Sequence, residues 1–142
     1  MTIAYTLGAG LAAAALAYGL NWLVLRHIGR GALWMVVPAL EETLKSLAAS
    51  VLNASLPGAH LVFGLVEAGH ELAAGRPSPI AASLALITHG VFGLLTWLLV
   101  PRGGLGPAIV AATTLHALYN MAVVRPRHGS PGRPHPAGEG AH

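Results

Sequence analysis

Long apolar runs separated by short breaks of Gly and Pro dominate the chain. About 20 residues of α-helix cross the hydrocarbon core of a bilayer, and Gly and Pro commonly mark the ends of such helices. The runs are too long for the strands of a barrel, whereas a helix satisfies its own backbone hydrogen bonds in lipid. The pattern therefore predicts an all-α fold, a multi-pass transmembrane helical bundle with five spans at about residues 3–25, 32–56, 59–74, 80–100 and 105–124.

The composition of the chain agrees with a membrane location. Of its 142 residues, 54% are hydrophobic and only 9% are charged, whereas about a quarter of the residues in a typical soluble domain are charged. The chain has no Cys, which excludes disulfides, iron–sulfur clusters and a cysteine nucleophile. We expect the lipid bilayer as its surroundings and no nucleic acid among its partners.

Residues 125–142 differ from the rest of the chain. This segment is rich in Pro, Gly, His and Arg, and such a composition predicts a disordered tail. With five spans, the tail shares one side of the membrane with the first and third connections. The opposite side carries Arg102 alone, whereas this side carries Arg26, Arg30, Arg76, Arg125, Arg127 and Arg133. The positive-inside rule then predicts a cytoplasmic tail and an amino terminus outside. We expect the membrane to be a bacterial cytoplasmic membrane.

Charged residues inside an apolar run need an explanation. The stretch EETLK places Glu41, Glu42 and Lys45 near the middle of the second run. A charge that faces lipid near a helix centre costs about 2.5–3.5 kcal/mol, so these side chains are expected to face the interior of the bundle. Lys45 follows the glutamates by four and three residues and can reach either carboxylate. Adjacent helical residues point about 100° apart, which indicates different roles for the two glutamates.

Ionisable residues of three other runs fall at a similar depth. Counted from the predicted cytoplasmic ends at 1.5 Å per residue, Glu67, His89 and His116 lie roughly 10–15 Å below the membrane face, as the EETLK residues do. Carboxylates beside imidazoles in a water-accessible cavity are suited to proton transfer. The sequence therefore predicts one interior layer of ionisable side chains.

Four short motifs follow one another on successive runs. EETLK (41–45) matches the pattern EExxK, and FGLVE (63–67) matches FGxxE. HGVFG supplies His89, and HALYN supplies His116 with Asn120 one turn later. Together, over about residues 32–124, these motifs resemble those of the PrsW-type intramembrane proteases. That family belongs to the CPBP superfamily, with the CAAX prenyl proteases and the bacteriocin-processing proteases.

The resemblance implies a glutamic-type intramembrane endopeptidase that hydrolyses membrane-embedded or membrane-adjacent proteins. One carboxylate of the EExxK pair, Glu41 in the first place, would act as the general base on a water molecule. Glu42 and Lys45 would hold this carboxylate and tune its basicity. The choice between the two glutamates as the base stays open at this point.

The other motif residues would complete such a site. By resemblance, Glu67 would orient the water or carry a proton, and His116 and Asn120 would donate hydrogen bonds to the developing oxyanion. His89 would assist one of these tasks. The prenyl proteases carry the patterns EExxxR and FxxxH, and neither occurs here, so prenylated CAAX proteins are not expected as substrates.

Three other interpretations stay open. A metal-dependent peptidase would bind zinc through Glu67, His89 and His116 and keep one position free; otherwise no cofactor is expected. A non-catalytic membrane scaffold or partner subunit would tolerate the exchange of Glu for Gln. A proton-coupled transporter or channel is disfavoured, because no inverted repeat is visible in the sequence. His60 is interpreted as a loop residue without a task.

Overall fold

The computed structural model describes residues 2–123, and over this range the chain is entirely helical, without a strand. This confirms the all-α prediction, and the predicted disordered tail at 125–142 lies outside the described residues. The elements are α1 (Ile3–His27), the short 3-10 helix η1 (Arg30–Trp34), α2 (Val36–Val51), α3 (Leu56–Ala73), α4 (Pro79–Gly103) and α5 (Leu105–Val123).

The helix that carries EETLK is shorter than the predicted span of 32–56. It begins at Val36, because residues 30–34 form η1 instead of the first turn of α2. It ends at Val51, and Asn53 then adopts a left-handed conformation with a φ of 49° that turns the chain back. The charged residues of EETLK therefore lie near the middle of a helix of 16 residues.

Serine caps set the starts of α3 and α4. The hydroxyl of Ser55 accepts a hydrogen bond from the backbone N–H of Gly58, and Pro57 occupies the first turn, where its missing N–H has no intrahelical partner in any case. The dipeptide PG thus belongs to α3, whereas the sequence pattern had predicted it as the break before a helix at about residue 59. The hydroxyl of Ser78 caps α4 in the same way.

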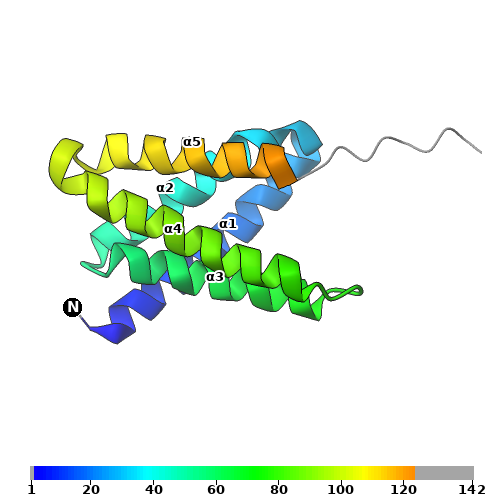
Figure 1. Ribbon diagram of the computed structural model, residues 1–142, viewed down its shortest axis with the longest axis horizontal. Coiled ribbons are helices and arrows are strands. Elements are labelled where there is room, and N and C mark those ends of the chain that lie inside the picture. The colour runs from blue at the N-terminus through cyan, green and yellow to red at the C-terminus, as the bar shows by residue number, and fades with distance from the viewer. Residues whose placement is uncertain (1, 124–142) are drawn as a thin grey trace, which may run out of the picture.

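The α-helices run up and down between two ends of the molecule (Figure 1). The N-terminus of α1, the α2–α3 turn and the α4–α5 turn lie at one end. The α1–η1–α2 connection, the α3–α4 turn and the end of α5 lie at the other. Accordingly, Arg26, Arg30 and Arg76 lie at the second end, while Arg102 lies at the first. Successive α-helices therefore run in alternating directions.

Small and polar side chains fill the interior, and large apolar side chains cover the outside. Every α-helix exposes Leu, Val, Ile, Met or aromatic side chains. The buried apolar residues are mostly alanines, and an added Cβ at Gly10 of α1 would lie only 2.8 Å from the backbone oxygen of Ala59 in α3. The largest side chains without any notable exposure are Lys45, His60, His89, Glu42, Thr96, Pro38 and Ser46.

Two of the described helices, α1 and α4, are long and apolar enough to cross a membrane by length and composition, with 25 residues each. A core helix of a soluble protein or an N-terminal signal sequence can meet the same two criteria. The polar interior is a separate observation. Lys and Glu are almost never fully buried unless they are paired, and Lys45 and Glu42 are buried as such a pair.

Candidate functional site

Lys45 of α2 lies at the centre of a buried polar cluster. Its Nζ atom donates a hydrogen bond to Oε1 of Glu42 at 2.5 Å and lies 2.9 Å from Nδ1 of His89 on α4. The same nitrogen lies 4.6 Å from the ring centre of Phe63 on α3, in a cation–π contact. Neither Lys45 nor Glu42 is exposed. Because a buried charge is tolerated when it is paired and hydrogen-bonded, these contacts explain how the interior accommodates EETLK.

His116 of α5 lies against both glutamates of α2. Its Nδ1 atom lies 2.9 Å from Oε1 of Glu42, and its Nε2 atom lies 3.9 Å from Oε2 of Glu41. Phe92 of α4 stacks on the imidazole with ring centres 4.8 Å apart, which fixes the ring plane. A single imidazole therefore connects the two neighbouring carboxylates.

Glu41 is held from α1, a helix that lies outside the region of the four motifs. Nδ2 of Asn21 donates to Oε1 of Glu41 at 2.8 Å. The sequence analysis did not single out Asn21, although it is the only amide side chain in an otherwise apolar helix. Buried polar side chains almost always have a hydrogen-bond partner. The isolated Asn could therefore have indicated that this face of α1 contacts a polar group of another helix.

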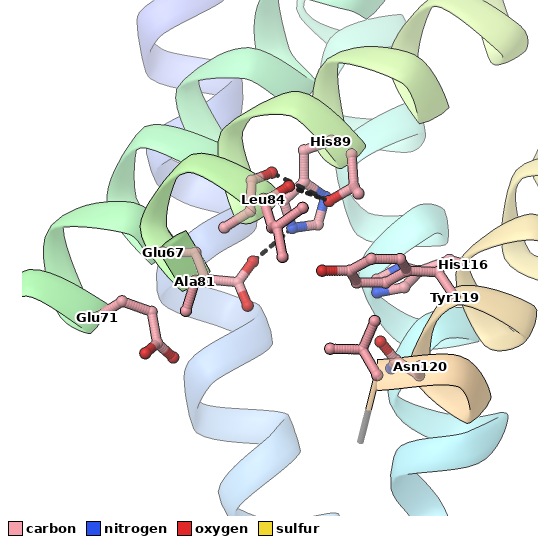
Figure 2. Close-up of a pocket in the computed structure, with 11 residues that line it drawn as sticks. Glu67, Glu71, Ala81, Leu84, His89, His116, Tyr119 and Asn120 are labelled. Atoms are coloured by element: carbon pink, nitrogen blue, oxygen red, sulfur yellow. Dashed lines mark hydrogen bonds and ion pairs between the residues drawn. The ribbon is translucent and has the colours of Figure 1, made fainter. Parts of the chain in front are cut away.

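Glu67 of α3 and His89 of α4 form the closest carboxylate–imidazole contact of the cluster. Nε2 of His89 lies 2.5 Å from Oε2 of Glu67 (Figure 2). Gly64, one turn before Glu67, allows this approach, because a Cβ there would lie 3.0 Å from the Cβ of His89. The glycine of FGLVE is thus a packing requirement of the α3–α4 contact. Both ring nitrogens of His89 are engaged, one by Glu67 and one by Lys45.

Asn120 lies at the edge of the cluster. Its Nδ2 atom donates to the backbone oxygen of Leu33 in η1 at 3.0 Å, so it connects α5 to the segment before α2. The amide nitrogen carries a second hydrogen that this contact does not use. Figure 2 shows Asn120 beside His116 and Tyr119, on the opposite side of the smaller cavity from Glu67.

Two cavities adjoin the cluster. The larger one has a volume of about 760 Å³ and is lined by residues of α1, η1, α2 and α3, Glu41 among them. The smaller one, of about 200 Å³, is lined by residues of α3, α4 and α5, including His89, His116 and Asn120 (Figure 2). Glu67 lines both cavities, whereas Glu42 lines neither. Within the EE pair, only Glu41 can meet a molecule that occupies either of these two spaces.

His60 is not a loop residue, and the interpretation made from the sequence is wrong at this position. It lies in the second turn of α3 and is completely buried. Its Nδ1 atom lies 3.5 Å from Oε2 of Glu42, and its Nε2 atom lies 3.4 Å from Oγ of Ser46. The sequence analysis missed it because the predicted third helix began at residue 59, which placed His60 at a surface end.

The three residues considered as zinc ligands, Glu67, His89 and His116, all belong to the hydrogen-bonded network. Within residues 2–123, no three His or carboxylate side chains are arranged to hold a metal ion. Nδ1 of His89 faces the ammonium group of Lys45, and Nε2 faces Glu67. The ring centres of His89 and His116 lie 5.5 Å apart.

In total, the structure brings six of the seven predicted site residues into one connected network, with Asn120 adjoining it through the smaller cavity. The network also contains three residues that sequence reasoning did not include, namely Asn21, Ser46 and His60. No protein-family model, no curated protein and no solved structure matches the chain.

Proposed function

We propose that the chain is a multi-pass membrane protein whose five α-helices cross a bilayer. The support is the inverted distribution of side chains: large apolar groups face outward from every helix, while the interior holds Glu42 and Lys45. Charged groups in a membrane helix face the bundle interior and pair with one another. The end of the molecule that carries Arg26, Arg30 and Arg76 would lie in the cytoplasm by the positive-inside rule. The amino terminus would lie outside, and the membrane would be a bacterial cytoplasmic membrane.

We further propose that the protein is a glutamic-type intramembrane endopeptidase. The observation that carries this proposal is the division of labour within the EE pair. Glu41 lines a cavity and is held by Asn21, while the adjacent Glu42 is enclosed by Lys45 and His116. A general base must reach both its water molecule and the substrate, and within the EE pair Glu41 is the residue that lines a cavity where both could bind.

The proposed reaction is the hydrolysis of an amide bond. The Glu41 carboxylate takes a proton from a water molecule, and the resulting hydroxide adds to the carbonyl carbon of the scissile bond. As the C–N bond breaks, Glu41 returns this proton to the amine that leaves. Glu42 and Lys45 act through position and charge, because neither reaches a cavity.

The remaining residues would stabilise the intermediate and hold the water. His116, whose Nε2 atom is directed toward Glu41, would donate to the oxyanion together with the free N–H of Asn120. Glu67 lines both cavities and contacts His89, so it would orient the water or pass on a proton. The substrate would be a membrane protein or peptide that unwinds locally to expose its amide.

This proposal is tested by incubating purified protein in liposomes with a panel of transmembrane peptides, with and without a chelator. Hydrolysis produces two fragments whose summed mass exceeds that of the peptide by one water molecule. We expect such pairs in both conditions. Activity that disappears with the chelator and returns with zinc would replace the glutamic mechanism by a metal-dependent one. Intact peptides throughout the panel would contradict the peptidase proposal.

A scaffold or partner subunit is the second candidate. The observation that favours it is that the Lys45–His89 and Glu67–His89 contacts join α2, α3 and α4, as purely structural hydrogen bonds would. This candidate predicts that a partner protein co-purifies equally with the wild type and with Glu41→Gln, and that no peptide is cleaved.

A further inference from the structure

His60 has no part in the mechanism described above, although it is one of the most deeply buried side chains of the protein. It lies on the side of Glu42 that faces away from His116. Oε1 of Glu42 already accepts from Lys45 and contacts His116. Its other oxygen, Oε2, has no hydrogen-bond partner among the described residues, and neither has Nδ1 of His60.

These two unpartnered atoms face each other at 3.5 Å. A buried polar atom without a partner is destabilising by about 1–3 kcal/mol, so two such atoms in contact indicate an interaction that a small adjustment completes. The tautomer of a histidine follows from its neighbours. With the proton on Nδ1, the ring can donate to Oε2 of Glu42 and accept at Nε2 from the hydroxyl of Ser46, 3.4 Å away. In this tautomer, Oε2 of Glu42 and both ring nitrogens of His60 have hydrogen-bond partners.

The packing around His60 leaves its ring little freedom. Gly93 of α4 lies directly against it, since an added Cβ would lie 2.6 Å from Cβ and 2.9 Å from Cγ of His60. Gly90, one turn earlier on the same helix, has only the end of the Leu61 side chain nearby, at 3.2 Å. The α4 backbone at Gly93 therefore packs against one side of His60, while the ring nitrogens face Glu42 and Ser46 of α2.

We propose that His60 is a positioning residue that acts through Glu42. By donating from Nδ1 to Oε2, it fixes the carboxylate plane so that Oε1 faces Lys45 and His116, and it thereby aligns His116 with Glu41. His60 itself reaches neither of the two cavities beside the cluster. Its role in turnover rests on the proposed function, whereas its contact with Glu42 does not.

Two substitutions separate positioning from simple packing. The side-chain nitrogen of Asn can occupy the place of Nδ1, while that of Gln falls near Nε2. We expect His60→Asn to keep kcat within about threefold of wild type, and His60→Gln to lower kcat about 10- to 100-fold at an unchanged KM, as the loss of outer-shell partners typically does. A packing role predicts the reverse order, because Gln is closer to His in volume. Equal kcat values in the two variants would overturn the proposal.

A second pair of variants leaves His60 itself unchanged. Gly93→Ala displaces the imidazole and is expected to lower kcat, whereas the matched control Gly90→Ala on the same helix is expected to keep it. If both variants retain the wild-type kcat, the position of the imidazole does not matter for turnover and the proposal is wrong.

The contact is also measurable without any activity. In the wild-type protein with ¹⁵N-labelled histidine, two-bond ¹H–¹⁵N correlations report which ring nitrogen carries the proton, and the His60 signals are assigned by their absence in His60→Asn. We expect the proton on Nδ1. A proton on Nε2 overturns the proposal even if the protein is a peptidase. If no peptide is cleaved but the proton is on Nδ1, the peptidase proposal fails while the contact between His60 and Glu42 stands.

Discussion

Glu41 and Glu42 are consecutive residues of α2, but only Glu41 lines a cavity, while Glu42 is enclosed between Lys45 and His116. The difference follows from helix geometry, since neighbouring side chains point about 100° apart. The Glu41 carboxylate faces α1 and the larger cavity, and the Glu42 carboxylate faces His60 of α3 and His116 of α5. The two positions should therefore respond differently to the same chemical change.

Glu42→Gln is expected to destabilise the fold. The substitution leaves Lys45 buried without its carboxylate, and removing one partner of a buried ion pair typically lowers stability by about 3–5 kcal/mol. We expect a lower midpoint of thermal unfolding in micelles than for the wild type. The double variant Glu42→Gln/Lys45→Met, which removes both charges, is expected to recover part of the loss. A wild-type midpoint in the single variant would contradict the pairing.

Asn120→Ala is expected to affect both stability and turnover. The backbone oxygen of Leu33 loses its donor, which corresponds to about 1 kcal/mol of folding free energy. Loss of an oxyanion donor typically lowers kcat about 100-fold or more, so kcat of this variant is measured on a cleaved transmembrane peptide. A decrease smaller than about tenfold would remove Asn120 from the list of main oxyanion donors.

Gly10→Ala is expected to separate α1 from α3. A Cβ at this position would lie 2.5 Å from Cβ of Val62 and 2.8 Å from the backbone oxygen of Ala59, and overpacking of this kind costs about 1–3 kcal/mol. Gly8→Ala is the matched control on the same helix, since nothing lies within 4 Å of its added Cβ. Ala favours a helix over Gly by about 1 kcal/mol, so the control should unfold at the same or a higher temperature. Equal midpoints would contradict the close packing of α1 on α3.

The proposed five-span arrangement predicts which loops share a side of the membrane. The chain has no Cys, so single cysteines report accessibility without background. Gly31, Gly75 and Gly106 each have open space for a side chain. In oriented vesicles, an impermeant maleimide is expected to label Gly31→Cys and Gly75→Cys from the same side, and Gly106→Cys from the opposite side. Labelling of all three from one side would contradict the five-span arrangement.

The helices could be predicted from the sequence because breaks that contain Gly and Pro separate the apolar runs. The start of α3 was predicted too late, at residue 59, because the hydroxyl of Ser55 determines the first turn of this helix and places Pro57 inside it. Hydropathy alone does not distinguish a proline that breaks a helix from one that begins it.

Part of the candidate site could be predicted from the sequence, because charged side chains in the interior of a bundle must pair with other polar groups. The depth argument grouped Glu67, His89 and His116 with the EETLK residues, and the structure joins them in one network. Asn21 was missed because depth does not say which face of a helix points inward, and His60 was missed because α3 begins three residues earlier than predicted. Their roles depend on how α1 and α3 are rotated about their axes, and this rotation is set by Gly10 and Gly93 at the close contacts.

The central claim is that Glu41 activates the water molecule. The most direct test compares kcat for one cleaved transmembrane peptide between the wild type, Glu41→Gln and Glu139→Gln, each in liposomes of the same composition. Gln keeps an oxygen that can accept from Asn21 but cannot take a proton from water. We predict no detectable turnover in Glu41→Gln, with its thermal midpoint retained, and the wild-type kcat in Glu139→Gln. Wild-type turnover in a folded Glu41→Gln protein would contradict the claim.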